Sequence, residues 1–337
     1  MKVSIIIPLF NRPDEISELL SSLTHQDVLN THPDDCALFE VIVVEDGSTI
    51  SSKEIVQSYA DKLPIIYLEK ENGGPAQARN FGVDHCNGNW LTFIDSDCVL
   101  PSGWLRAIIN TTQDDNTDLF GGADKASSDF SPIQKAINYS MTSFFTTGGI
   151  RGSKNSMEKF HPRSFNMTIR KSIFDKVGQF ASDMRFGEDV DLSIRLMKAG
   201  ARSGYIEDAW LYHKRRVDFT KFYRQVRASG TARIALWHKH PHSLKLVHLM
   251  PLAFFLYLIG TIVTVAIPLP SYITLLVILP LVIWTLLITI DSSIQNKSLK
   301  VGILSILSSI IQLSGYAMGF LWALFGGGKS ANKNFYK

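Results

Sequence analysis

The 337-residue chain contains little cysteine and neither of the two common glycine-rich phosphate loops. Its three cysteines, Cys36, Cys86 and Cys98, are odd in number and lack CxxC spacing, so the sequence indicates neither a disulfide framework nor a zinc site. We expect them to be reduced thiols in a cytosolic domain. Neither GxxxxGK(S/T) nor GxGxxG occurs, which excludes a P-loop nucleoside triphosphatase and a Rossmann dehydrogenase.

Charge is absent from three long apolar runs, residues 247–269, 271–290 and 301–325. Their lengths of 23, 20 and 25 residues reach the roughly 18 to 20 residues that a helix needs to cross a bilayer core. We therefore expect about three transmembrane helices rather than a set of buried core helices, which excludes a purely soluble chain. The start of the chain has no signal-peptide pattern, because Pro8 and then charged residues interrupt its apolar run, so the first 245 residues are expected in the cytoplasm.

A basic segment precedes the first apolar run. Residues 213–245 hold nine lysines and arginines against one acid, Asp218, as is typical of the cytoplasmic flank of a membrane helix. Four apolar residues recur there at helical spacing, with cations around them: Phe219, Phe222, Tyr223 and Val226, with Arg215, Arg216, Lys221, Arg224 and Arg227. This pattern predicts an interfacial helix on anionic lipid, and the alternative is an amphipathic helix packed on the soluble domain.

The end of the chain conflicts with three crossings. They would place the tail lysines Lys329, Lys333 and Lys337 on the outer side, whereas cations usually stay on the cytoplasmic side. Either the third apolar run is re-entrant or the tail is an exception to the rule.

The first part of the chain alternates strands and helices. Short apolar, β-branched runs at 3–8, 40–44, 65–68 and 90–94 are separated by helical patterns at 13–24, 51–61 and 75–85. This alternation predicts an α/β fold with a mostly parallel sheet. Each strand is followed by polar residues, and ligands of such sheets bind beyond the carboxyl ends of the strands. We therefore expect one shared cleft at that edge.

Two groups of acids stand out at this edge. Asp95 and Asp97 flank Ser96 after an apolar strand, and in an extended segment they would project to the same side, where Mg²⁺ or Mn²⁺ could hold a substrate diphosphate. The alternative is a pair of exposed loop acids. Glu188 and Asp189 open a helix, where acids either complement the helix dipole or act as a general base towards a hydroxyl.

Six runs of sequence together resemble glycosyltransferase family 2. They are VSIIIPLFNR (3–12), VIVVEDGST (41–49), NGGPAQARN (72–80), FIDSDC (93–98), FNMTIRKSIFDKVGQF (165–180) and GEDVDLSIRLMKAG (187–200), and the resemblance covers residues 1–235. It implies a GT-A fold and an inverting, metal-dependent transfer of a sugar from a nucleotide-diphosphate donor, with UDP as the expected nucleotide. Glu45 departs from the commoner aspartate at its position.

The resemblance also implies roles for individual residues. Asp189, with Glu188, would be catalytic. The donor-binding residues would be Pro8, Asn11, Glu45, Asp46, Arg79 and Asp95. The divalent cation would be held by Asp95, Asp97 and His213. The expected domains are 1–212 for the transferase, 213–246 for the interfacial segment, 247–325 for the membrane helices and 326–337 for the tail.

The expected function is that of an integral membrane enzyme of the bacterial inner membrane with a cytoplasmic catalytic domain. It would add a single sugar to a hydroxyl of a lipid-linked glycan in cell-surface polysaccharide or glycoconjugate synthesis. A processive synthase is disfavoured because the QxxRW motif is missing. The alternatives are a polyprenyl-phosphate glycosyltransferase and a non-catalytic scaffold. No nucleic-acid partner is expected, and loops around 121–160 would select the sugar.

Overall fold

The computed structural model describes residues 1–30, 38–114, 116–125, 127, 129–148, 162–184 and 186–326. Cys36, the tail lysines and part of the predicted sugar-selecting loops lie outside these residues. The chain divides into two compact units. The first comprises Met1–Ser127 and Glu158–Lys214, and the second comprises Ser128–Met157 and Arg215–Lys337. The second unit is thus built from two separate stretches of sequence.

The first unit is organised around a seven-stranded sheet of order β3-β2-β1-β4-β8-β6-β9. Neighbours from β3 to β4 are parallel, β8 is antiparallel to both β4 and β6, and β9 is parallel to β6, so the sheet is mostly parallel as predicted. The strands are β1 (Val3–Leu9), β2 (Phe39–Asp46), β3 (Ile65–Lys70), β4 (Trp90–Ile94), β6 (Leu119–Gly121), β8 (Asn166–Arg170) and β9 (Ser203–Tyr205).

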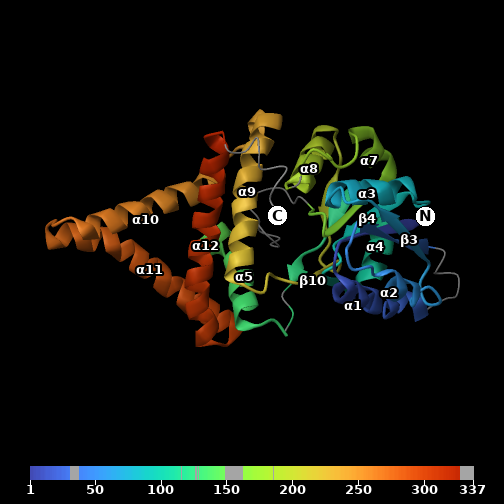
Figure 1. The fold of residues 1–337 in the computed structure, drawn as a ribbon, viewed down its shortest axis with the longest axis horizontal. Helices are drawn as coiled ribbons and strands as arrows, with labels where there is room; N and C mark the ends of the chain where they lie inside the picture. The colour runs from blue at the N-terminus through green and yellow to red at the C-terminus, as the bar shows by residue number, and fades with distance from the viewer. Residues whose placement is uncertain are drawn as a thin grey trace. The chain divides into compact units, whose positions relative to one another are not determined.

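Helices cover both faces of this sheet (Figure 1). Side chains of β1 alternate between the two faces, so Ile5 packs in one core and Ile6 in the other. The first core includes residues of α1 (Pro13–Thr24), α2 (Lys53–Gln57) and α4 (Trp104–Thr112), next to η1 (Asp27–Asn30). The second includes residues of α3 (Pro75–Asp84), α7 (Lys171–Val177) and α8 (Glu188–Lys198). Burial on both faces explains why β1 and β2 are almost continuously apolar.

A small second sheet lies beyond the end of β4. It has three strands in the order β5-β10-β7, namely β5 (Cys98–Val99), β7 (Asp124–Lys125) and β10 (Leu211–His213). The register pairs His213 of β10 with Cys98 of β5. This pairing brings residues 115 positions apart in sequence to one place beside Asp97.

The second unit is helical. It contains α5 (Pro132–Thr142), α6 (Phe144–Thr147), α9 (Phe219–Lys239), η3 (Pro241–Ser243), η4 (Leu246–Leu249), α10 (Met250–Ala266), α11 (Ser271–Asn296) and α12 (Leu299–Leu324). Among the described residues, three helices are long and apolar enough to cross a membrane, in Leu246–Ala266, Ser271–Asn296 and Leu299–Leu324. They coincide with the three apolar runs of the sequence, so the predicted C-terminal apolar helices are confirmed.

The basic segment forms α9, whose N-terminal cap is the carboxylate of Asp218 accepting from the Lys221 backbone N–H at 2.7 Å. The apolar stripe of this helix packs on protein: Phe222 and Val226 are buried in a cluster with Ile137 and Met141 of α5. Any contact of α9 with lipid therefore depends on its cations and not on its stripe. Arg215 does not belong to those cations, because it is buried and its Nε donates to Asn138 Oδ1 at 3.0 Å.

Candidate active site

The loops after the first strands are fastened to one another. Asn11 adopts a left-handed conformation after β1, with φ of 52°, which asparagine tolerates better than most residues. Its side-chain Oδ1 accepts from the backbone N–H groups of Thr49 and Ile50, at 2.8 and 3.2 Å. Asn11 therefore connects the loop after β1 to the loop after β2. Both loops lie at the carboxyl ends of the parallel strands, the edge that the sequence predicts for the cleft.

Asp46, at the end of β2, organises the loop after β3. Its two carboxylate oxygens accept from the N–H groups of Gly73 and Gly74 at 2.9 and 2.7 Å, and Lys70 Nζ lies 2.7 Å away. Gly74, with φ of 89°, caps α3, and Pro75 is the first residue of that helix, as the sequence predicts. Asp46, which the sequence predicts to border the nucleoside, thus also holds the glycine loop in place.

Glu45 is buried next to Asp46 and faces other partners. Its carboxylate accepts from the Ser52 N–H at 3.0 Å and from the Tyr67 hydroxyl. Burial and this carboxylate raise the pKa of Tyr67, so the phenol stays protonated and keeps donating. Pro8, the remaining predicted donor residue of this region, lies within β1 opposite Val44.

Arg79 of α3 stands between two acids. It is buried, its Nη2 lies 2.6 Å from Asp95 Oδ1, and its Nη1 lies 3.1 Å from Glu188 Oε1. Burial alone would lower the pKa of Arg79, but Asp95 and Glu188 raise it, so the guanidinium stays charged. One cation thus joins the end of β4 to the start of α8.

Glu188 and Asp189 have different environments although they are neighbours. Glu188 is buried, and burial together with the adjacent charge of Asp189 raises its pKa to about 7. The Asp189 side chain is 16% exposed, and its Oδ2 lies 3.4 Å from Arg163 Nη1. Of the two acids, Glu188 pairs with a buried arginine, whereas Asp189 is partly exposed and pairs with a partly exposed one.

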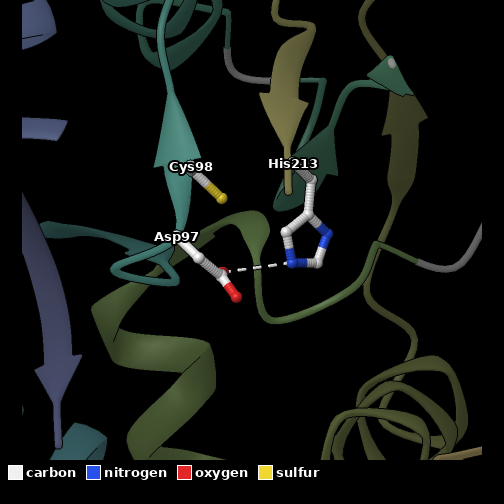
Figure 2. A group of neighbouring side chains, drawn as sticks. All are labelled: Asp97, Cys98 and His213. Atoms are coloured by element: carbon white, nitrogen blue, oxygen red, sulfur yellow. Dashed lines mark ion pairs between the residues drawn. The ribbon is translucent and has the colours of Figure 1, made fainter. Parts of the chain in front are cut away.

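Asp97 and His213 form the second centre of the site (Figure 2). His213 Nε2 lies 3.2 Å from Asp97 Oδ1, and Arg12 donates to Asp97 Oδ2. Although burial opposes ionisation, His213 and Arg12 hold the pKa of Asp97 well below its usual range. The side chains of Asp97, Cys98 and His213 place three potential ligand atoms within 4.8 Å of one another.

The donor set of this group fits a divalent cation in part. Asp97 Oδ1 is buried and makes no hydrogen bond of good geometry, which leaves it available as a ligand. A carboxylate suits Mg²⁺ and Mn²⁺, whereas an imidazole nitrogen suits transition metals, so the pair fits Mn²⁺ better than Mg²⁺. Cys98 suits them less, because burial raises the pKa of its thiol well above the ordinary value and keeps it protonated. Of the three side chains, Asp97 and His213 are therefore the two that could hold a divalent cation.

The structure brings most of the predicted site residues together, but in a different geometry for one pair. Residues 96 and 97 form a turn, closed by the Cys98 N–H donating to the Asp95 carbonyl oxygen at 3.2 Å. Asp95 and Asp97 are therefore not successive outward residues of an extended strand, as the sequence argument assumed. Asp95 pairs with Arg79, whereas Asp97 pairs with Arg12 and His213.

Sequence reasoning missed the cations that neutralise the acids. Arg12 and Arg163 pair with Asp97 and Asp189, and Lys70 pairs with Asp46. Arg12 belongs to the first of the six quoted runs, but the sequence does not indicate that it pairs with Asp97. Arg163 and Lys70 lie outside the quoted motifs, and no spacing rule connects them to their acids.

Comparisons with known proteins agree with this architecture. The family model of glycosyl transferase family 2 matches residues 4–178, just over half of the chain. The glycosyltransferase AglE of Haloferax volcanii is 29% identical over 254 residues, which cover 74% of this chain and 79% of that protein. The poly(ribitol-phosphate) beta-N-acetylglucosaminyltransferase TarS of Staphylococcus aureus is 40% identical over 108 residues, covering 32% of this chain and only 18% of TarS.

The fold also resembles solved structures. The mannosyltransferase PcManGT of Pyrobaculum calidifontis, solved with GDP-Man and Mn²⁺, has a TM-score of 0.62 at 17% identity, covering 92% of this chain and 87% of that one. The likeness supports a GT-A-like α/β domain followed by helices. Together with the family match over residues 4–178, it identifies the chain as a member of glycosyltransferase family 2.

Proposed function

We propose that this protein is a metal-dependent, inverting glycosyltransferase that moves one sugar from a nucleotide-diphosphate donor, with UDP as the nucleotide, to a hydroxyl of a lipid-linked glycan. It would work at the cytoplasmic face of a bacterial inner membrane, in the synthesis of a cell-surface glycan. The observation that supports this proposal is the arrangement of acids at one edge of the sheet, where Asp97 and His213 bring potential ligand atoms close together and Asp189 stays partly exposed.

The donor would lie over the ends of the strands. Asn11 and Asp46 hold the loops that would border the nucleoside, and Arg79 would place positive charge near the diphosphate. A divalent cation held by Asp97 and His213 would neutralise charge on the departing diphosphate. The Mn²⁺ and GDP-Man found with PcManGT support a cation and a nucleotide sugar of this kind.

The chemical step would be a single displacement. The acceptor hydroxyl oxygen forms a bond to the anomeric carbon while the bond from that carbon to the diphosphate oxygen breaks. The hydroxyl proton passes to Asp189, and the bonding electrons leave with the nucleoside diphosphate. Because the two bonds lie on opposite sides of the anomeric carbon, the configuration inverts. Glu188 stays paired with the buried Arg79, and this contact holds the start of α8 in place.

The test is Asp189→Asn in the full-length protein. Loss of a general base lowers turnover by about 10² to 10⁴, whereas affinity for the donor should stay near that of the wild type. Transfer is measured in membranes with a panel of labelled nucleotide sugars, and donor binding with the same nucleotides. The control is Asp208→Asn, since Asp208 is an exposed acid of the same unit.

Two results would contradict the proposed role of Asp189. Equal loss of donor affinity would make it a binding residue. A loss of turnover much smaller than tenfold would favour a phosphate acceptor, which is already anionic and needs no strong base, and hence the polyprenyl-phosphate alternative.

A further inference from the structure

The third apolar helix differs from the other two in how its surface is covered. In α10 and α11, 6% of the most apolar window is buried within the protein, whereas in α12 the share is 44%. Many residues on the covered face of α12 are small or carry a hydroxyl, among them Ser305, Ser308, Ser309, Gly315 and Gly319. The opposite face exposes a stripe of large apolar side chains, namely Leu299, Ile303, Leu307, Met318 and Trp322. This helix is therefore two-sided.

The contacts at the two ends of α12 define its direction. Near its start, Ser305 Oγ lies 2.7 Å from Ser292 Oγ in the last turns of α11, and Gly302 lies against the Thr289 carbonyl of the same helix. Near its end, Phe320 and Ala323 pack in one cluster with Leu249 and Leu252, at the start of α10. The start of α12 thus meets the end of α11, and its end meets the start of α10.

These contacts are incompatible with three successive crossings. When α10 and α11 cross as a hairpin, the start of α10 and the end of α11 lie on the same side of the membrane. A third crossing would carry the end of α12 to the opposite side, next to the turn at residues 267–270. Instead both ends of α12 contact the near side. Figure 1 shows α12 beside α9, with α10 and α11 extending away from the two.

The neighbour of α12 supports the same arrangement. Gly315 and Gly319 allow close approach of α9, and Thr231 Oγ1 of α9 donates to the Gly319 carbonyl at 3.2 Å. The α9 helix also exposes Lys221 and Arg224, in the turns next to Tyr223 and Val226, which contact Gly315. If α12 crossed the bilayer, these cations would be drawn into the hydrocarbon layer, which costs several kcal/mol for each charge.

We propose that α12 lies along the cytoplasmic membrane surface beside α9 and does not cross, so that the α10–α11 hairpin is the membrane anchor. The partner of this apolar surface is the lipid leaflet. The stripe from Ile303 to Trp322 enters the boundary of the acyl chains, and α9 packs on the opposite face of α12, away from the lipid. This arrangement is independent of the transferase chemistry.

The proposal also accounts for the charges after α12. With two crossings, Lys329, Lys333 and Lys337 return to the side of the basic segment, in agreement with the usual distribution of cations. The conflict that three crossings create in the sequence then disappears.

The first experiment determines the side of the tail in the full-length protein. Cys36 and Cys86 are replaced by serine, the buried Cys98 remains, and single cysteines are added by Lys62→Cys, Ser271→Cys or Ser330→Cys. Sealed inverted and right-side-out membrane vesicles are treated with an impermeant polyethylene-glycol maleimide, which adds a visible mass. The parent without an added cysteine reports the background from Cys98.

We expect Ser330→Cys to react in the same vesicles as Lys62→Cys, and Ser271→Cys to react only in the vesicles of opposite orientation. Reaction of Ser330→Cys together with Ser271→Cys would overturn the proposal. Reaction in both kinds of vesicle would also overturn it, because α12 would then have no fixed side.

A second experiment distinguishes a helix along the surface from a re-entrant one. Spin labels are attached at Ile303→Cys and Met318→Cys, both on the exposed face, and their depths are measured from relaxation by oxygen and by a water-soluble nickel complex. At about 1.5 Å per residue, the two positions are roughly 22 Å apart along the helix. We expect equal, shallow depths. Depths that differ by more than about 10 Å, half of that separation, would show that α12 enters the membrane and would overturn the proposal.

Discussion

The two units bury polar groups of different kinds. The first unit buries charges, and Arg79, Asp97 and Asp46 each have an oppositely charged partner. The helical unit, apart from Arg215, buries mainly hydroxyls, such as those of Ser140 and Ser308, which lie 2.7 Å apart. Buried ion pairs hold charged groups in fixed positions where a substrate can bind, but removing one partner costs several kcal/mol of stability. Neutral hydroxyls and glycines let apolar helices approach without leaving a charge in a non-polar layer. The difference indicates that the first unit is built for chemistry and the second for anchoring.

The largest effect is expected where a buried charge serves the reaction. Asp97→Asn should lower transfer by about 10³-fold, because a catalytic cation contributes several kcal/mol and each 1.4 kcal/mol is a factor of ten. EDTA should have the same effect on the wild type. Activity is measured with the labelled donor in membranes. Asp27→Asn is the control, since Asp27 also pairs with an arginine, Arg106 at 2.8 Å, but on the surface. Full activity in EDTA would refute the cation.

The second prediction compares the stability lost when a buried ion pair is broken with that lost when an exposed ion pair is broken. Arg79→Gln should destabilise the first unit by about 3 to 5 kcal/mol, because the buried Glu188 and the partly exposed Asp95 both lose a buried, charged partner. Arg106→Gln, which breaks the exposed pair with Asp27, should cost about 1 kcal/mol or less, since water screens that pair. Chemical unfolding followed by a probe in the first unit measures both. Equal costs would mean that the Arg79 network contributes no more than a surface pair.

In the helical unit, the corresponding test is steric. A Cβ at Gly319 would collide with the Arg227 carbonyl oxygen of α9, whereas a Cβ at Gly260 of α10 meets no atom within 4 Å. Gly319→Val should therefore destabilise the pair of α9 and α12 by about 1 to 3 kcal/mol, the usual cost of overpacking. Gly260→Val should change stability much less. Thermal unfolding in detergent compares the two, and similar losses would show that the close approach is not needed.

The smallest effect concerns pH. The pKa of Glu188 rises from an ordinary 4.5 to about 7 on folding, so its contribution to stability is complete below about pH 4.5 and is lost as the pH rises through 7. Glu188→Gln lacks this loss. The melting temperature of the wild type relative to that of Glu188→Gln should thus fall by a few degrees between pH 5 and pH 8. A constant difference, or one of opposite sign, would contradict the raised pKa.

The sequence predicts local features of the fold well because they follow from neighbouring residues. The continuous apolar runs of β1 and β2 indicate strands covered on both faces, and Pro75 after two glycines marks the start of α3. The acids of the candidate site follow the same logic, since they stand directly after β4 and at the start of α8.

The sequence does not predict features that depend on distant partners. Arg12 and Asp97 are paired across 85 positions, and the turn closed by Cys98 gives Asp95 and Asp97 different partners. The amphipathic pattern of α9 shows that one face is buried but not against what, and the structure places α5 and α12 there. Residues 128–157 have no compositional boundary that would separate them from the transferase sequence.

The discontinuous second unit limits how the protein can be divided. Because α5 belongs to that unit, a chain shortened to residues 1–214 would keep α5 and lose its neighbours α9 and α12. Ile137, Met141 and the Ser140 hydroxyl would then be exposed to water. Removal of the anchor would therefore expose an apolar helix face in the remaining chain, so a soluble form of the transferase unit cannot be made by shortening the chain at residue 214 alone.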